Sequence, residues 1–324
     1  MRKVQFAEFG GPERLTGVAA ESPPVAPGQV RIKVHAVGVN FAELVQLSGN
    51  FQIPVDLPAV PGFELSGTVT ELGAGVDRLS LGERVVALVC WGAYAEEVVV
   101  DAVTVAGVPD GADLDTAAAF PVAFGTAFMC LHHRAQVNAN DVVVVSGANG
   151  NVGHAAVQVA RQLGAVQVIA VTRDGTETMA HADAVLASTD KLAAQIADLT
   201  RGHGADVILD LVGGAVFPQL LEAVAWEGRV VTAGYASGNI PNISLLDVLI
   251  RNIAVLGEDI AAYTVREPHR VGDALRTCVG WWRQGAVEPR PPVTTMPLED
   301  AAKALSMVAQ ASAGGKIVLS ANSL

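Results

Sequence analysis

The stretch VVVVSGANGNVG, residues 142–153, decides the fold of this chain. Its four valines, bounded by polar and glycine residues, predict a strand that is buried on both faces. A segment with helical spacing follows at 155–163, so Gly150 and Gly153 lie at a strand-to-helix turn. There Gly150 lets the backbone approach a pyrophosphate, Gly153 lets the helix pack on the strand, and the helix N-terminus supplies free N–H groups. Glycine turns also join ordinary βα units, and Ala148 replaces the usual first glycine, so the interpretation as a dinucleotide site depends on the surrounding strands.

The segments after this turn alternate between strand and helix patterns, which is typical of βαβ units and a doubly wound parallel sheet. The predicted strands are 166–171, 206–211 and 229–233, and the predicted helices are 191–199 and 217–225. The fold class is therefore α/β, with a Rossmann-type sheet.

The segments on either side of this unit lack its regular alternation of strand and helix patterns. Short strands separated by Gly and Pro predict an antiparallel, barrel-like β-rich unit before residue 115, and a long helix is expected over 116–135. These strands are 30–36, 66–72, 84–89 and 95–100. Beyond residue 252 the alternation ends, and the tail is expected to pack on the N-terminal unit. The expected tail elements are a strand at 253–256, helices at 271–283 and 298–309, and a strand at 316–319. The predicted domains are thus 1–118, 119–252 and 253–324.

Composition and charge narrow the choice of partners and compartment. The formal net charge of −12 over 324 residues disfavours binding to nucleic acid or to anionic membrane surfaces. No apolar run reaches the ~18 residues of a membrane-spanning helix, and the N-terminus lacks the apolar stretch of a signal peptide. The three cysteines, Cys90, Cys130 and Cys278, are far apart and do not form a disulfide framework. We therefore expect a cytoplasmic protein.

The second strand of the βαβ unit bears on the choice of dinucleotide. NAD enzymes usually end this strand with an acid that binds the ribose 2′-hydroxyl, but Thr172 stands here. Arg173 follows and can pair with a 2′-phosphate, which favours NADPH. Asp174 is the alternative, since a slip of one residue would make it the ribose acid. The predicted cofactor-binding residues are Ala148, Gly150, Asn151, Val152, Gly153, Thr172, Arg173, Gly234 and Tyr235.

Several motifs outside the glycine turn resemble one known family. PGFELSGTV at 61–69 and LGERV at 81–85 resemble the P-G-x-E-x-x-G-x-V and G-D-R-V signatures of medium-chain dehydrogenases/reductases. Segments 199–214 and 314–319 resemble the family's third Rossmann strand and its C-terminal strand. The resemblance covers nearly the whole chain and implies a Rossmann domain inserted in a GroES-like catalytic domain. It also implies a homodimer, for which the apolar stretch 243–256 is the expected pairing edge.

The zinc-binding positions of that family are occupied here by other residues. The matching positions are Asn40, Phe63 and Val122 or a close neighbour, and none of these ligates zinc. The segment VNFA at 39–42 is similar to the zinc-free quinone oxidoreductases of the zeta-crystallin type. The sequence therefore predicts a protein with no metal.

The resemblance to quinone oxidoreductases also implies which residues form the site. Asn40 and Thr126 would approach the nicotinamide, and Glu64 would be a buried acid or a brace for the pocket. The predicted substrate pocket contains Phe51, Trp91, Phe124 and Tyr263, although ordinary core packing explains the three residues other than Tyr263 equally well. Phe51 stands where the family often has a tyrosine, so the only phenols of the catalytic domain left as proton donors are Tyr94 and Tyr263.

The expected reaction is hydride transfer from NADPH to a quinone or a small enone. A quinone needs no strong acid, because a hydroquinone anion can take its proton from water. Two alternatives stay open: an enoyl-thioester reductase of the same fold, and a protein that binds NADPH without catalysis.

Overall fold

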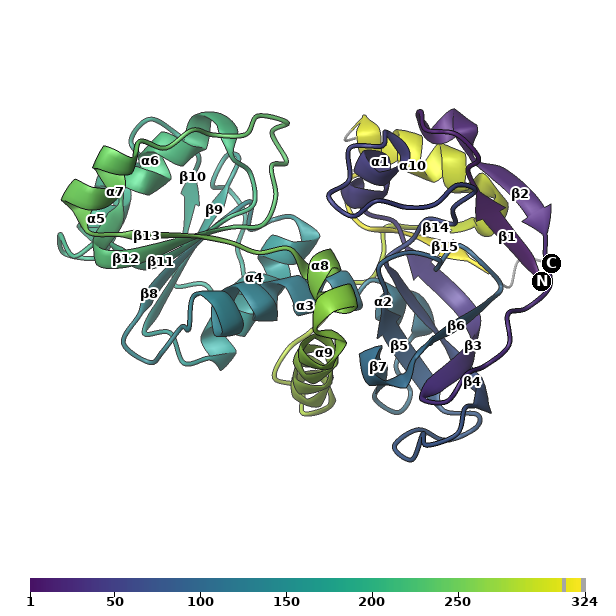
Figure 1. Cartoon of the computed structure of the whole chain (residues 1–324). Helices are drawn as coiled ribbons and strands as arrows, with labels where there is room; N and C mark the ends of the chain where they lie inside the picture. The colour runs from purple at the N-terminus through teal and green to yellow at the C-terminus, as the bar shows by residue number, and fades with distance from the viewer. Residues whose placement is uncertain (311–312, 322–324) are drawn as a thin grey trace. The chain divides into compact units, whose positions relative to one another are not determined.

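The computed structural model describes residues 1–310 and 313–321 and divides the chain into two compact units (Figure 1). Unit 1 comprises Met1–Gly125 and Ile260–Leu324, and unit 2 comprises Thr126–Asp259. The chain therefore leaves unit 1, forms unit 2 as one continuous stretch, and then returns. Each internal boundary lies seven residues after the one predicted from the sequence, at 125 instead of 118 and at 259 instead of 252.

Unit 2 is built on six parallel strands in the order β10-β9-β8-β11-β12-β13, which confirms the predicted Rossmann-type sheet. The strands are β8 (Val142–Ser146), β9 (Gln167–Thr172), β10 (Ala184–Ala187), β11 (Ala205–Asp210), β12 (Val224–Thr232) and β13 (Ala254–Gly257). Every residue of β8 is buried, as expected for a run of valines in the middle of a parallel sheet. The strand expected at 253–256 exists as β13, but it pairs with β12 and belongs to this sheet rather than to the tail.

Four α-helices belong wholly to unit 2: α4 (Asn151–Gln162), α5 (Leu192–Leu199), α6 (Phe217–Glu222) and α7 (Leu245–Arg251). Apolar side chains of α5 and α6 pack with one face of β8, β9 and β11 in a single hydrophobic cluster. α4 contacts β8 and β9 without joining that cluster. α7 buries none of its residues.

Unit 1 contains a seven-stranded sheet in the order β14-β15-β3-β4-β5-β7, with β6 paired to β3, and a separate pair of β1 and β2. The strands are β1 (Arg2–Gln5), β2 (Thr16–Ala19), β3 (Gln29–Gly38), β4 (Glu64–Leu72), β5 (Arg84–Leu88), β6 (Glu97–Asp101), β7 (Val105–Gly107), β14 (Thr294–Pro297) and β15 (Ile317–Ser320). All pairs except β14 with β15 are antiparallel. β15 pairs with β3 near its end, so that Val318 faces Gly38. This is the inserted arrangement that the family resemblance implied.

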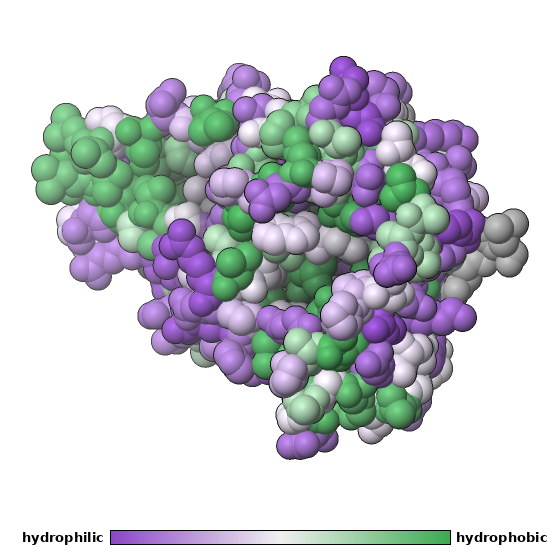
Figure 2. All heavy atoms as spheres, turned by 45° about the vertical axis from the view of Figure 1, so that its right-hand side comes forward, coloured by the Kyte–Doolittle hydropathy of each residue, from purple (hydrophilic) through white to green (hydrophobic). Residues whose placement is uncertain are grey.

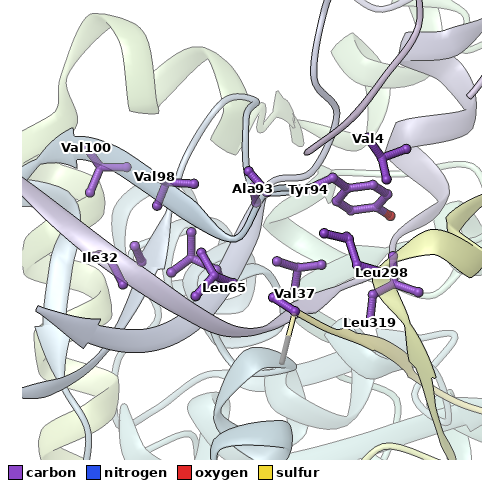
Figure 3. Packing of buried hydrophobic residues seen from close by; sticks show 14 of the residues in the cluster. Val4, Ile32, Val37, Leu65, Ala93, Tyr94, Val98, Val100, Leu298 and Leu319 are labelled. Atoms are coloured by element: carbon purple, nitrogen blue, oxygen red, sulfur yellow. The ribbon is translucent and has the colours of Figure 1, made fainter. Parts of the chain in front are cut away.

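The core of unit 1 lies between this sheet and helices from both ends of the chain. Figure 3 shows side chains from β3, β4 and β15, such as Ile32, Leu65 and Leu319, in the buried cluster that also contains Tyr94. The helices of this unit are α1 (Phe41–Leu47), α2 (Leu114–Ala118), α8 (Ile260–Arg266), α9 (Pro268–Arg283) and α10 (Ala301–Ala309), and α3 (Pro121–Phe128) continues from unit 1 into unit 2. No helix in the described part of the chain is both long and apolar enough to cross a membrane.

The single helix predicted over 116–135 is wrong. α2 ends at Ala118, α3 begins at Pro121, and a π-helical segment follows over Met129–Arg134. Proline has no N–H and restricts the residue before it, so Pro121 can begin a helix but cannot continue α2. The high alanine content around it concealed this break.

Candidate functional site

The glycine turn joins β8 to α4 and is tied to the end of β9. The N–H of Ala148 donates to the carbonyl of Val171 over 3.0 Å. α4 has Gly150 at its N-cap and no side chain that caps its first turn. Asn149 and Gly150 are exposed. The first N–H groups of a twelve-residue helix are therefore available to an anion, which fits the pyrophosphate of a dinucleotide.

The two glycines of the turn have different structural roles. A Cβ atom on Gly153 would lie 2.2 Å from the carbonyl oxygen of Gly147, so the contact between turn and helix requires glycine there. On Gly150 the nearest atom to a Cβ would be the same oxygen, at 3.3 Å. This agrees with the sequence interpretation that position 153 serves helix packing, whereas position 150 leaves its outer side open.

The end of β9 contains an acidic side chain that sequence reasoning missed. The hydroxyl of Thr172, which is buried, donates to Glu177 Oε2 over 2.7 Å and accepts from the N–H of Gly175 over 3.0 Å. Asn149 Nδ2 donates to Glu177 Oε1 over 2.9 Å. The hydroxyl of Thr172 is thus occupied by hydrogen bonds within the protein. Glu177 links the second strand of the βαβ unit, β9, to the glycine turn. The sequence signal that could have indicated that the loop after β9 turns back toward the glycine turn is Gly175, which adopts a positive φ of 70°.

The other predicted cofactor residues lie at the same edge of the parallel sheet. Arg173 is exposed, and so is Asp174, whose carboxylate accepts from the Thr176 hydroxyl over 3.2 Å. Gly234 and Tyr235 follow β12 and are half-buried. Because the strands are parallel, the ends of β8, β9 and β12 place all nine predicted residues along the carboxyl edge of unit 2.

Unit 1 holds a buried polar cluster that contains two of the three predicted catalytic residues. Lys316 Nζ donates to Asn40 Oδ1 over 2.6 Å and forms an ion pair with Glu64 Oε1. Asn40 Nδ2 donates to the same oxygen of Glu64 over 3.1 Å. Glu64 Oε2 accepts the N–H of Val122 over 2.8 Å. The side chains of Lys316 and Glu64 are only 3% and 0% exposed, so this charged pair is a buried one.

This cluster fixes the orientation of the Asn40 amide. An ammonium group only donates, so the atom of Asn40 that faces Lys316 must be the oxygen. Besides its bond to Glu64, Nδ2 has only long contacts, 3.4 Å to Glu43 Oε1 and 3.5 Å to the Gly38 carbonyl. One N–H of Asn40 is therefore weakly bound within the protein. Glu64 accepts from three donors, which corresponds to the brace of the two roles considered.

Glu43 is the second carboxyl group of this region, and the sequence analysis did not identify it. It is fully buried on α1, and its Oε2 accepts the backbone N–H of Asn40 over 2.8 Å, which caps the helix. Burial raises the pKa of Glu43 to about 8, although the positive charge of Lys316 partly opposes this rise. Glu43 is thus protonated at neutral pH.

The raised pKa of Glu43 predicts that stability declines between about pH 4.5 and pH 8. In the unfolded chain Glu43 loses its proton near its ordinary pKa of 4.5, whereas in the folded protein it keeps the proton until about pH 8. Between these values the folded state binds more protons, so the contribution of Glu43 to the free energy of unfolding falls as the pH rises. Urea unfolding at pH 5 and pH 8 measures the decline. Glu43→Gln should show a smaller decline than the wild type, and equal declines would contradict the assignment.

The residues predicted to line the pocket or to donate a proton lie in different surroundings. Phe51 lies against Phe63, with ring centroids 5.3 Å apart, in a small cluster that includes Ala261 of α8; Tyr263, also on α8, is half-buried. Phe124 is 2% exposed and stacks on Phe120 with centroids 4.3 Å apart, which is core packing.

Three further residues lie apart from that cluster. Trp91 is 44% exposed, and Thr126 is buried in unit 2. Tyr94 is buried within the core of unit 1, and burial raises its pKa well above its ordinary value (Figure 3). Tyr94 is therefore a poor proton donor.

Comparison with known proteins gives two family matches along the chain. Residues 26–110 match the alcohol dehydrogenase GroES-like domain, and residues 151–276 match the zinc-binding dehydrogenase family. No group of three or more His, Cys, Asp and Glu side chains within residues 1–310 and 313–321 is arranged to hold a metal ion. The absence of zinc is still a prediction from the sequence.

Three individual proteins illustrate what the chain resembles. Quinone oxidoreductase-like protein 2 of Mus musculus is 33% identical over 302 residues, which are 92% of this chain and 86% of that protein. A mycobacterial structure complexed with NADPH is 29% identical with a TM-score of 0.85, covering 99% of this chain and 100% of the other. The JamJ enoyl reductase is 25% identical with a TM-score of 0.82, covering 98% of each chain.

Proposed function

Since the chain belongs to the medium-chain dehydrogenase/reductase superfamily and is related to its quinone oxidoreductases and enoyl reductases, we propose that it is a zinc-independent reductase that transfers a hydride from NADPH to a quinone or a small enone. The observation that carries the proposal is the fixed amide of Asn40, which stands at a zinc-ligand position of the family. Its oxygen is held by Lys316, so only its N–H group is left for a substrate.

Residues of unit 2 would hold the dinucleotide. The N–H groups at the start of α4 bind the pyrophosphate, and Gly150 lets it come close. Arg173, exposed at the end of β9, pairs with the 2′-phosphate. The similar mycobacterial structure that contains NADPH supports this choice of cofactor. When bound, the nicotinamide supplies the hydride.

Residues of unit 1 would serve the substrate. Asn40 donates its weakly bound N–H to the carbonyl oxygen on which negative charge develops during reduction. Glu64 and Lys316 keep the amide in this orientation, because both are buried and are bonded to it. The pair is mutually neutralised, so it supplies no proton. A hydroquinone anion takes its proton from water, and this suits a site whose carboxylate is fully bonded.

The test is the rate of NADPH consumption in Asn40 variants. Asn40→Asp keeps an oxygen for Lys316 but replaces the donor with an acceptor, and it should lower kcat by about 10²-fold, as the loss of one oxyanion donor does. Asn40→Ala should fall similarly. In both variants the Kd for NADPH should change little. A value of kcat for Asn40→Asp within about twofold of the wild type would overturn the donor role, since changes that small are far below the loss of such a donor.

Reduction of enoyl thioesters is the second candidate. Its support is the similarity to the JamJ enoyl reductase over 98% of each chain. The same measurement, run with quinones, small enones and enoyl thioesters in parallel, separates the two candidates by the ratio of their kcat/KM values. NADPH binding without turnover of any of the three classes would instead indicate a non-catalytic protein.

We further propose that the protein is a homodimer that pairs through unit 2. β13 is an edge strand of the six-stranded sheet, and α7 precedes it with its apolar side chains exposed. Figure 2 shows hydrophobic side chains gathered at the left of the view, over the part of unit 2 that carries α7 in Figure 1. The exposed residues here are Ile240 (70%), Leu245 (82%), Leu246 (62%), Leu249 (73%) and Ile250 (61%). An exposed apolar patch beside an open sheet edge is typical of a two-fold interface.

A further inference from the structure

We infer that Glu177 determines the cofactor specificity of this protein: its carboxylate accepts the 2′-hydroxyl of the adenosine ribose, disfavours a 2′-phosphate, and so limits the preference for NADPH that Arg173 provides. The inference rests on the proposed dinucleotide site and adds a residue to it. Glu177 lies outside the position where a ribose acid is expected, since it stands five positions after Thr172, the last residue of β9.

The position of Glu177 is set by two hydrogen bonds from the elements that flank an adenosine ribose. Asn149 belongs to the turn after β8, and it holds Oε1 over 2.9 Å. Thr172 ends β9, and it holds Oε2 over 2.7 Å. In a Rossmann-type unit the ribose lies between this turn and the end of the second strand. The loop after β9 thus places the carboxylate of Glu177 beside Thr172, which stands where an acidic residue is usual.

The carboxylate has capacity left for a ligand. An ionised carboxylate offers about four lone-pair sites, and the two hydrogen bonds from Asn149 and Thr172 use one on each oxygen. Glu177 is half-buried, so part of its side chain is accessible. Both protein partners are donors, which leaves the oxygens as acceptors. A ribose hydroxyl can donate to them, whereas a phosphate at the same place brings a second negative charge.

Two neighbouring charges in the same loop, Arg173 and Asp174, are exposed. Arg173 is exposed and forms no hydrogen bond or ion pair among the described residues, so its guanidinium is available to a 2′-phosphate. Asp174 is also exposed, and its carboxylate accepts a hydrogen bond from the Thr176 hydroxyl within the loop. The loop therefore offers one cation for the phosphate and one anchored anion against it. We expect the protein to bind both cofactor types, with a ratio that these two side chains set in opposite directions.

The experiment measures binding of two adenosine ligands that lack nicotinamide, so it does not depend on turnover. Adenosine 2′,5′-bisphosphate and adenosine 5′-monophosphate are titrated by calorimetry against the wild type and against Glu177→Gln. The glutamine keeps the size of the side chain and an oxygen, but it removes the charge. The ratio of the two affinities should shift toward the bisphosphate by about tenfold or more, the size of one hydrogen bond to a charged group. Arg173→Ala should shift the ratio in the opposite direction.

Asp174→Asn is the matched control, because it removes the same charge from the same loop. It should move the ratio by less than about a third of the Glu177→Gln shift, since exposed charges are screened by salt. An equal shift in both variants, or no shift in Glu177→Gln with an unchanged melting temperature, overturns the inference. A shift confined to Asp174→Asn would make Asp174 the ribose acid. If the wild type binds neither ligand, the proposed dinucleotide site is wrong, and the role of Glu177 falls with it.

Discussion

Replacing Lys316 by methionine is expected to lower the free energy of unfolding of unit 1 by about 3–5 kcal/mol. Lys316 neutralises Glu64, and both side chains are almost completely buried. Methionine fills a similar volume, but it leaves the buried Glu64 carboxylate without its positively charged partner. Urea unfolding followed by tryptophan fluorescence measures the loss in unit 1, because three of the four tryptophans lie there: Trp91, Trp281 and Trp282.

Two further variants separate this effect from a general loss of charge. Lys303, on α10, is exposed, and Lys303→Met should change stability by no more than about 0.5 kcal/mol. The double variant Lys316→Met/Glu64→Gln should be more stable than Lys316→Met alone, since it removes the uncompensated carboxylate. A cost below about 1 kcal/mol for Lys316→Met would show that the pair is hydrated and not buried as described.

Placing glutamates at Leu245 and Leu249 is expected to convert the proposed dimer into a monomer. These residues are one helical turn apart on α7 and are 82% and 73% exposed within one chain. In a two-fold interface each glutamate occurs twice, so four like charges would be buried without partners. Sedimentation velocity at micromolar concentration gives the mass of the wild type and of the double variant.

The control for this change is Leu81→Glu. Leu81 is similarly exposed, at 65%, but it lies in a turn of unit 1. The variant should sediment as the wild type does. A wild type that is already monomeric, or a double variant that stays dimeric, would remove the α7 interface from the proposal.

The sequence alone was sufficient for four of the six strands of the parallel sheet, whereas β10 was not predicted and β13 was assigned to the tail. A run such as 142–145 is buried on both faces and is too short for a helix, so its hydrophobicity and its glycine boundary together define a strand. β12 begins at Val224, before the predicted start at 229. The prediction missed the first part of the strand because Glu227, with a positive φ of 60°, and Gly228 interrupt it. α7 was missed because none of its residues is fully buried, so no stripe facing a core could be recognised.

The candidate site was predicted in part. Asn40 and Glu64 were found from local motifs, but Lys316 was noted only as part of a strand motif. Its role depends on the pairing of β15 with β3, which joins residues more than 270 positions apart in the chain. Local patterns carry no information on such a contact. Glu177 was missed for a different reason, since its place depends on the path of a short loop.

The return of the chain to unit 1 has a consequence for the order of events during synthesis. A ribosome releases all of unit 2 before β14 and β15 emerge, so the Rossmann-type sheet can form while the first unit lacks two of its strands. Until then Glu64 and Asn40 have no ammonium partner, and an edge of β3 is open to other chains. The nascent protein is thus most exposed to aggregation and to chaperones after unit 2 has emerged and before β14 and β15 have, when the Rossmann-type sheet is complete and the sheet of unit 1 is not.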